Sequence, residues 1–257
     1  MDLELKDFFS EHRRVAIAFS GGVDSAYLLY AAKLYAEELA AYYVQSDFQP
    51  EFEREDACCL AGQLDLPLTV LHATVLSDPQ VASNPPDRCY YCKRRIFSVI
   101  EDRAKSDGFE VILDGTNASD DAGDRPGMKA LKELSVLSPL RVCGLTKSRI
   151  RELSKEAGLF TWNKPAYACL ATRIPHGTPI SKERLERTER AEAFLMSLGF
   201  SDFRVRTAVI DGRDCARLEL KESQLAKLCG MRSRIVSQLK DGCGYSRVLV
   251  DLEMRNE

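Results

Sequence analysis

Histidine is scarce in this chain of 257 residues, tryptophan occurs once, and no apolar run is long. With only three histidines, a histidine-rich metal site is a poor expectation. The longest apolar run covers residues 26–32, far short of the roughly 20 residues that a membrane-spanning helix needs. The opening residues also lack the apolar core of a signal peptide. These absences favour a cytoplasmic protein without a membrane partner.

The chain has little excess of either charge, since Lys and Arg number 36, Asp and Glu number 39, and the net charge is −3. Such a balance gives no overall field that would attract nucleic acid, so we expect no nucleic-acid partner. Hydrophobic residues make up 45% and charged residues 29%, as in globular proteins. The length is about 1.7 times a typical domain, which favours two domains or one domain with an appendage.

Cysteine, by contrast, is abundant. There are nine, an odd number that argues against a disulfide framework and for a reducing compartment. Six of them are interpreted as small buried hydrophobic residues. These six are Cys58, Cys59, Cys143, Cys215, Cys229 and Cys243.

The other three cysteines lie in segments suited to chemistry. Cys89 and Cys92 form a CxxC pair, which by itself is compatible with a zinc half-site, a redox pair or two buried thiols. Cys169 lies close to Lys164 and Arg173, and cationic neighbours favour the reactive thiolate form of a cysteine. If cysteine acts chemically here, it does so as a thiolate, a sulfur donor or a cluster ligand.

Short apolar strands alternate with helices through the first half of the chain, which predicts an α/β fold with a mostly parallel sheet and helices on both faces. The predicted strands are residues 15–19, 40–44, 68–71 and 111–113, and the predicted helices start at 25, 51, 91 and 146. The irregular segment 159–178 is interpreted as a functional loop. We therefore place one domain at residues 1–177 and a second at 178–257.

The second domain is predicted to be a small α+β module with the element order αββαβ. Ser181 caps a charged helix, residues 222–239 are helical with a break near Gly230, and residues 246–252 form the last strand.

Asp211-Gly212 in this module is a strong signal for a two-residue hairpin turn. If these two residues are the turn, Arg204 faces Glu219 and Val205 faces Leu218. One face of the hairpin is then apolar and the other charged, and this separation supports the pairing of the two strands in that register.

Residues 20–25, Ser-Gly-Gly-Val-Asp-Ser, lie between the first strand and the first helix, where open α/β sheets bind ligands. Two glycines let the backbone approach a pyrophosphate, Ser20 and Ser25 supply hydroxyl groups, and the helix N-terminus attracts an anion. Asp24 is better suited to hold Mg²⁺ or to orient the turn than to meet a bare phosphate. The segment lacks the lysine of a kinase-type P-loop. A simple Gly-rich turn with a serine cap is the alternative interpretation.

The segment VAIAFSGGVDSAYLL resembles the SGGxDS signature of the PP-loop ATP pyrophosphatases, which have an adenine nucleotide alpha hydrolase-like fold. The resemblance covers the N-terminal sheet and implies cleavage of ATP between the α and β phosphates with Mg²⁺, and adenylation of a carbonyl or carboxylate oxygen. It implies that Asp24 is catalytic and that ATP is bound by Ser20, Gly21, Gly22, Asp24 and Ser25. Gly115 and Thr116, in the sequence DGTN at a strand end, are expected on the other side of the nucleotide.

A narrower resemblance is carried by CYYCK at 89–93, DGTNASDD at 114–121, RPG at 125–127, SPL at 138–140, GLTKSRIRELS at 144–154 and KPAYACLATRIPHG at 164–177. Together these segments resemble the LarE family of sulfur-inserting PP-loop enzymes. The resemblance implies that the substrate is pyridinium-3,5-biscarboxylic acid mononucleotide. Its carboxylates would be adenylated and converted to thiocarboxylates on the route to the nickel-pincer nucleotide cofactor.

The resemblance implies one of two sulfur sources. In one route the cysteine matching Cys169 gives up its own sulfur and becomes dehydroalanine. In the other, cysteines matching Cys89, Cys92 and Cys169 hold a 4Fe-4S cluster whose fourth iron carries a sulfide, and we favour this route because the chain has all three thiols. A zinc site with Cys143 or His176 as fourth ligand is a third, less favoured option.

Two arginines of the hairpin, Arg204 and Arg206, match an RVR pattern that binds the substrate phosphate in the family, and Arg173 is a similar candidate. A solvated hairpin face is the alternative interpretation of the same pattern. We expect a small-molecule mononucleotide as partner, with a homo-oligomer and an external sulfide or sulfur donor left open. The rival functions are tRNA 2-thiolation, amide formation as in NAD or GMP synthetases, and non-catalytic binding of a nucleotide or metal.

Overall fold

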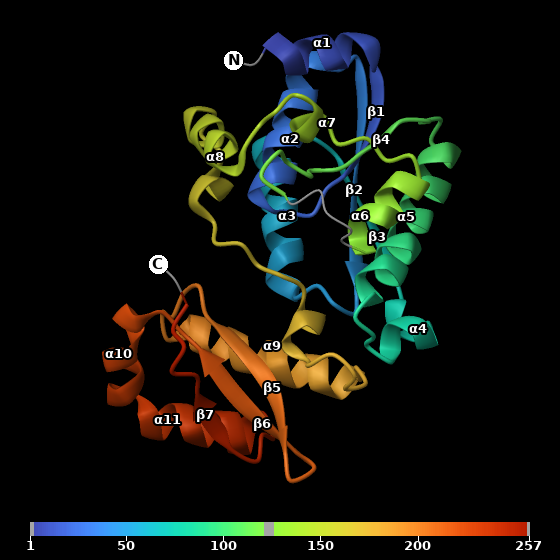
Figure 1. The fold of residues 1–257 in the computed structure, drawn as a ribbon. Coiled ribbons are helices and arrows are strands. Elements are labelled where there is room, and N and C mark those ends of the chain that lie inside the picture. The colour runs from blue at the N-terminus through green and yellow to red at the C-terminus, as the bar shows by residue number, and fades with distance from the viewer. Residues whose placement is uncertain (1–2, 121–125, 256–257) are drawn as a thin grey trace. The chain divides into compact units, whose positions relative to one another are not determined.

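The computed structural model describes residues 3–120 and 126–255, which form two compact units (Figure 1). The first unit comprises Met1–Val75 and Asp87–Lys164, and the second comprises Leu76–Pro86 and Pro165–Glu257. Asp121 and Arg125, which belong to two of the motifs above, lie outside the described residues.

The first unit is built on a four-stranded parallel sheet, as the alternation of strands and helices predicts. Its strands are β1 (Arg14–Ala18), β2 (Glu38–Ser46), β3 (Leu68–Ala73) and β4 (Ile112–Leu113). Their order in the sheet is β3-β2-β1-β4, so β1 lies in the interior. Because β1 and β4 are adjacent and parallel, the segments that follow their carboxyl ends meet at one edge of the sheet.

Helices cover both faces of this sheet (Figure 1). The helices of the first unit are α1 (Leu3–Glu11), α2 (Val23–Tyr35), α3 (Glu51–Gln63), α5 (Arg88–Ser106), α6 (Pro126–Glu133), α7 (Pro139–Val142) and α8 (Lys147–Glu156), with a short 3-10 helix η2 (Phe160–Asn163). Buried side chains of α2, α3 and α8 pack with those of β1 in one apolar core. Helix α5 packs against α6 and against strands of the sheet.

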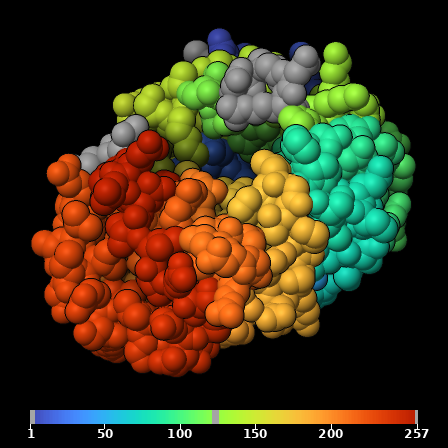
Figure 2. Space-filling view, turned by 60° about the horizontal axis from the view of Figure 1, so that its bottom comes forward, coloured from blue at the N-terminus to red at the C-terminus, as the bar shows by residue number. Residues whose placement is uncertain are grey.

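The second unit contains a three-stranded mixed sheet with the order β5-β6-β7. Its strands are β5 (Arg204–Ile210), β6 (Arg213–Glu219) and β7 (Val248–Val250), and its helices are α4 (Pro79–Ala82), α9 (Lys182–Ser197), α10 (Leu225–Gly230) and α11 (Arg232–Ser237). Short helical turns η1 (Val75–Ser77), η3 (Leu170–Arg173), η4 (Glu222–Gln224) and η5 (Gln238–Gly242) connect the chain. From α9 onward the elements follow the predicted order and enclose their own apolar core. Figure 2 shows this part, orange to red, as a continuous surface.

The hairpin of β5 and β6 has the predicted register. Arg204 pairs with Glu219, Val205 with Leu218, and the turn is Asp211-Gly212. Both turn residues have positive φ, 51° and 71°, as a tight turn that continues the right-handed twist of the strands requires. Local turn chemistry and the apolar face therefore determine the pairing together.

Several expectations need correction. Cys58 and Cys59 are exposed because α3 buries Ala57 and Leu60 instead, and Cys229 is exposed as well. Cys215 and Cys243 are buried as expected. The compact units adjoin in sequence at Lys164 and Pro165, so the segment that carries Cys169 belongs to the second unit, and the domain boundary at residue 177 stays a prediction.

Among the described residues, no helix is long and apolar enough to span a membrane.

Candidate functional site

The loop between β1 and α2 requires glycine at position 21. Gly21 has a φ of +76°, and a Cβ there would lie 3.2 Å from the carbonyl oxygen of Glu53. Gly22 is the N-cap residue of α2 and leaves the first turn of the helix without a side-chain cap. The backbone amides at the N-terminus of α2 therefore remain suited to an anion.

Two hydroxyl groups fix the shape of this loop. The Oγ atoms of Ser20 and Ser25 lie 3.0 Å apart. Ser25 Oγ also accepts a hydrogen bond from the Ser20 amide at 3.2 Å and donates one to the Gly22 carbonyl oxygen at 3.1 Å. Since each bond closes within the loop, its curvature is set before any ligand arrives.

A cavity of about 360 Å³ opens over this loop, within the first unit. It is lined by six of the seven residues that the sequence assigns to ATP, namely Ser20, Gly22, Asp24, Ser25, Gly115 and Thr116. Gly21 is not among the lining residues. Phe97 and Ile100 of α5 also line the cavity and supply apolar surface, and Lys93 of the same helix supplies a charge. The combination of a polar loop and an apolar wall suits a nucleotide.

The DGTN segment after β4 forms the second side of the cavity. A Cβ on Gly115 would lie 2.8 Å from the amide nitrogen of Ser25, so only glycine allows the two loops to approach this closely. Asp114 holds the segment in place, because its carboxylate accepts hydrogen bonds from Ser138 Oγ at 2.6 Å and from Thr116 Oγ1 at 2.5 Å.

Asp24 is the charged residue of the loop, and it has one partner that the sequence does not reveal. One carboxylate oxygen, Oδ2, is bonded to the ammonium group of Lys147. The other, Oδ1, is buried and has no hydrogen-bond partner among the described residues. Burial raises the pKa of Asp24, while the hydrogen bond and charge of Lys147 act in the opposite direction. The unpartnered oxygen fits a hard cation such as Mg²⁺.

The CxxC cysteines lie near the N-terminus of α5 and therefore in the first unit. Their i, i+3 spacing puts Cys89 and Cys92 on one side of the helix, with Cys89 exposed and Cys92 half-buried. Arg88, which is buried, donates a hydrogen bond to Cys89 Sγ at 3.7 Å.

Cys169 belongs to the second unit, where it is the N-cap residue of η3. Within the described parts of the chain, no three or more His, Cys, Asp or Glu side chains are placed together to hold a metal ion. Of the three cysteines that would hold an iron-sulfur cluster, Cys89 and Cys92 therefore lie in the first unit and Cys169 lies in the second.

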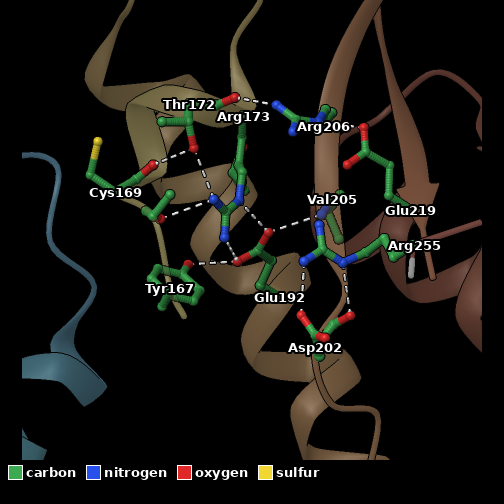
Figure 3. A network of polar contacts seen from close by, with 12 residues as sticks. Tyr167, Cys169, Thr172, Arg173, Glu192, Asp202, Val205, Arg206, Glu219 and Arg255 are labelled. Carbon is green, nitrogen blue, oxygen red and sulfur yellow. Dashed lines mark hydrogen bonds and ion pairs between the residues drawn. The ribbon is translucent and has the colours of Figure 1, made fainter. Parts of the chain in front are cut away.

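The segment that carries Cys169 is held by a buried ion pair (Figure 3). Arg173 is only 1% exposed, and its guanidinium bonds both carboxylate oxygens of Glu192 on α9, at 2.8 and 3.1 Å. It also donates to the carbonyl oxygen of Ala168 at 2.9 Å. Burial alone would lower the pKa of Arg173, but Glu192 raises it above its ordinary value, so the charge is kept.

The same carboxylate connects Cys169's segment to strand β5. Glu192 accepts hydrogen bonds from the Val205 amide at 2.9 Å and from the Tyr167 hydroxyl at 2.5 Å (Figure 3). Arg206 on β5 donates to the carbonyl oxygen of Thr172 at 2.6 Å and is paired with Glu219.

Arg204 differs from its neighbours because its side chain has no hydrogen bond or ion pair with any described residue. Burial lowers its pKa, as do the positive charges of Arg255, Arg173 and Arg206 nearby. Of the three arginines that the sequence assigns to the substrate phosphate, Arg204 therefore has a vacant guanidinium, whereas Arg173 is engaged inside the protein. A role for Arg173 in binding phosphate would require it to leave Glu192.

Comparison with known proteins agrees with this geometry. The family model described as a PP-loop domain matches residues 1–123. A pyridinium-3,5-bisthiocarboxylic acid mononucleotide synthase of Lactiplantibacillus plantarum is 34% identical over 242 residues, which are 93% of this chain and 86% of that protein. An uncharacterized protein of Synechocystis is also 34% identical, over 97% of this chain and 92% of that protein. A tRNA-specific 2-thiouridylase of Clostridium botulinum is 27% identical over 58% of this chain and 52% of its own length.

Proposed function

Because the chain belongs to the family of pyridinium-3,5-bisthiocarboxylic acid mononucleotide synthases, the LarE-like PP-loop sulfur transferases, we propose that it makes this thiocarboxylate product. The substrate is pyridinium-3,5-biscarboxylic acid mononucleotide, and the product leads to the nickel-pincer nucleotide cofactor. The observation that carries this proposal is that one chain combines an ATP cavity, a cysteine held in an arginine network, and a vacant guanidinium at Arg204.

Activation of the carboxylate is the first step. The PP-loop binds ATP with Mg²⁺, and Asp24 Oδ1 is the oxygen suited to the cation. A carboxylate oxygen of the substrate attacks the α-phosphorus, the bond to the αβ-bridging oxygen breaks, and pyrophosphate leaves with the electron pair. The product is an acyl adenylate, and no proton needs to move.

Recognition of the substrate phosphate is assigned to Arg204 and Arg206. Arg204 needs no partner to be displaced, whereas Arg206 keeps the segment of Cys169 in place through the carbonyl of Thr172. Phosphate binding at Arg204 would relieve the mutual repulsion of Arg204, Arg255 and Arg206. Arg173 then acts by positioning the segment, although the sequence also makes it a candidate for phosphate.

Sulfur transfer follows, with Cys169 central in either route. A 4Fe-4S cluster held by Cys89, Cys92 and Cys169 would supply a sulfide from its open iron. In the sacrificial route, the thiolate of Cys169 attacks the acyl carbon and AMP leaves. Loss of the Cα proton and cleavage of the Cβ–S bond then release the thiocarboxylate and leave dehydroalanine. We favour the cluster route, because the sacrificial route needs only one of the three thiols.

Anaerobic reconstitution with iron and sulfide tests the source of sulfur. The cluster route predicts about four irons per chain, and loss of the cluster when the three cysteines are replaced. Replacement of Cys58, Cys59 and Cys229 is the matched control, because these thiols are exposed and outside the proposed site. If no iron binds and Cys169 becomes lighter by one sulfur and two hydrogens after turnover, the sacrificial route is correct.

The function itself is tested by incubating the enzyme with ATP, Mg²⁺ and the dicarboxylate mononucleotide. Pyrophosphate and AMP should appear only with both substrates, and mass spectrometry should detect the exchange of carboxylate oxygen for sulfur. Release of pyrophosphate without the mononucleotide, but with tRNA, would favour 2-thiolation instead. That alternative is suggested by the partial match to the thiouridylase, but the net charge of −3 disfavours it.

The nine cysteines, none in a disulfide, agree with a proposed site of action in the reducing cytoplasm.

A further inference from the structure

The PP-loop contains no basic residue between Ser20 and Ser25. A triphosphate carries several negative charges, and its binding usually relies on cationic side chains in addition to backbone amides. The cation nearest to the loop's own carboxylate comes from elsewhere in the chain. Lys147, the first residue of α8 and 123 positions beyond Asp24, places its ammonium group on Asp24 Oδ2.

The backbone fixes the start of α8 against the second side of the cavity. The Lys147 amide donates to Ser119 Oγ at 2.9 Å, and the Ala118 amide donates to the carbonyl oxygen of Leu145 at 2.8 Å. Thr146 caps the helix by accepting a hydrogen bond from the Arg149 amide. Since these bonds hold the backbone of Lys147, only its side chain is left to move.

The other cations near the loop have different positions or partners. Lys164 is paired with Asp56 at 2.6 Å, and it contacts the loop only at the backbone, where it donates to the Gly21 carbonyl oxygen at 3.5 Å. Arg151 donates to the carbonyl oxygens of Trp162 and Lys164. Lys93 lines the cavity from α5, the helix that supplies the apolar wall. Lys147 is the cation in contact with a PP-loop side chain, and its own side chain is 34% exposed.

We propose that Lys147 is the phosphate-binding cation of the ATP site, exchanging Asp24 for the β- and γ-phosphates when magnesium and ATP bind. Both carboxylate oxygens of Asp24 are then available to Mg²⁺, and the ammonium group of Lys147 remains next to the Asp24 carboxylate. This assignment deepens the proposed function and rests on its ATP-dependent step.

The same position gives Lys147 a role in the chemistry. When the substrate carboxylate attacks the α-phosphorus, negative charge develops on the αβ-bridging oxygen and leaves with pyrophosphate. An ammonium group that already contacts the β-phosphate stabilises this charge without moving a proton.

Equilibrium binding of ATP and of AMP, each with Mg²⁺, tests the proposal by titration calorimetry. AMP has no β- or γ-phosphate, so Lys147→Met should weaken ATP binding about 10- to 100-fold, as loss of a charge-assisted hydrogen bond does, and leave AMP binding unchanged. Lys147→Arg should restore most of the ATP affinity. Lys155→Met is the matched control, because it removes a charge from the last turn of the same helix, where Lys155 lies over the Trp162 ring.

An equal loss of affinity for ATP and AMP would overturn the proposal, because it would indicate a structural role for Lys147. Unchanged ATP affinity, or an ATP-specific loss in Lys93→Met that is absent in Lys147→Met, would overturn it as well. These titrations need neither the mononucleotide nor a sulfur donor. A selective effect on ATP in a protein that forms no thiocarboxylate would therefore contradict the proposed function and support the role of Lys147.

Discussion

Glu192 and Arg173 form a two-point ion pair that is almost completely excluded from water, with side-chain exposures of 2% and 0%. The pair joins α9 to η3, and through the Val205 amide it also joins both to strand β5. Because η3 follows Cys169 directly, this ion pair fixes the backbone on which the cysteine lies, and the charge of Arg173 also interacts with the cysteine.

Removal of Glu192 should be strongly destabilising. Glu192→Ala leaves the charge of Arg173 buried and unpaired, and breaking a buried pair in this way typically costs about 3–5 kcal/mol. Urea denaturation followed by circular dichroism measures the change in the free energy of unfolding. Glu186→Ala is the control, since Glu186 forms an exposed pair with Lys182 on the same helix and its loss should have little effect. Similar stabilities for the two variants would contradict this interpretation of Glu192.

Arg204→Ala should raise KM for the mononucleotide about 10- to 100-fold and leave KM for ATP unchanged, because the substrate phosphate would lose a charge-assisted contact. Steady-state release of pyrophosphate measures both constants. Arg217→Ala is the matched control on the neighbouring strand, since Arg217 is paired with Glu219 and Asp251. If Arg204→Ala leaves KM for the mononucleotide unchanged, Arg204 does not bind its phosphate.

The sequence predicts those features of the fold that depend on short-range patterns. Strand periodicity gives the parallel sheet, and Asp211-Gly212 gives the register of the hairpin, because a two-residue turn leaves only one pairing. The position of the cavity follows from the same patterns. The Ser20–Ser25 signature comes after β1 and the DGTN segment comes after β4, and these two adjacent parallel strands end at the same edge of the sheet.

Contacts between residues far apart in the sequence could not be predicted in this way. Lys147 reaches Asp24 across 123 positions, and the local signals, a helix start at Thr146 and the family-like segment 144–154, do not indicate this contact. Arg173 looks like an anion-binding residue by type, but its burial depends on how η3 packs on α9. The exposure of Cys58 likewise depends on which face of α3 meets the sheet. The sequence indicates this face only weakly, because alanine and cysteine lie on several sides of the helix.

Gly115→Ala should abolish measurable ATP binding, because the added Cβ would lie 2.8 Å from the Ser25 amide nitrogen and would push the two sides of the cavity apart. The same calorimetric titration with ATP measures the loss. Gly62→Ala is the control, since a Cβ at this helical position meets nothing within 4 Å. That variant should bind ATP normally and gain about 0.5–1 kcal/mol of stability from the higher helix propensity of alanine. Normal ATP binding by Gly115→Ala would show that the two loops can separate without loss of the site.

The stability of Lys147→Met should depend on pH through Asp24. Burial raises the pKa of Asp24 in the folded protein above its ordinary value near 4, and Lys147 limits this rise. Below about pH 4 the carboxyl is protonated in both the folded and unfolded states, so it contributes no penalty. As pH increases from there through the raised folded pKa, the unfolded chain ionises more readily, and stability falls. Without Lys147 the folded pKa is higher still, so the variant should lose more stability over this window and stay below the wild type at neutral pH.

Urea denaturation between pH 4 and 8 measures this difference. Adding Asp24→Asn to Lys147→Met removes the titrating group, so the double variant should lose the extra pH dependence while Lys155→Met should follow the wild type. A gap between Lys147→Met and the wild type that is equally large at pH 4 and pH 8 would mean that Lys147 stabilises the fold through its packing. In that case its pairing with Asp24 would contribute nothing measurable, and the charge exchange that we infer for ATP binding would lose its thermodynamic basis.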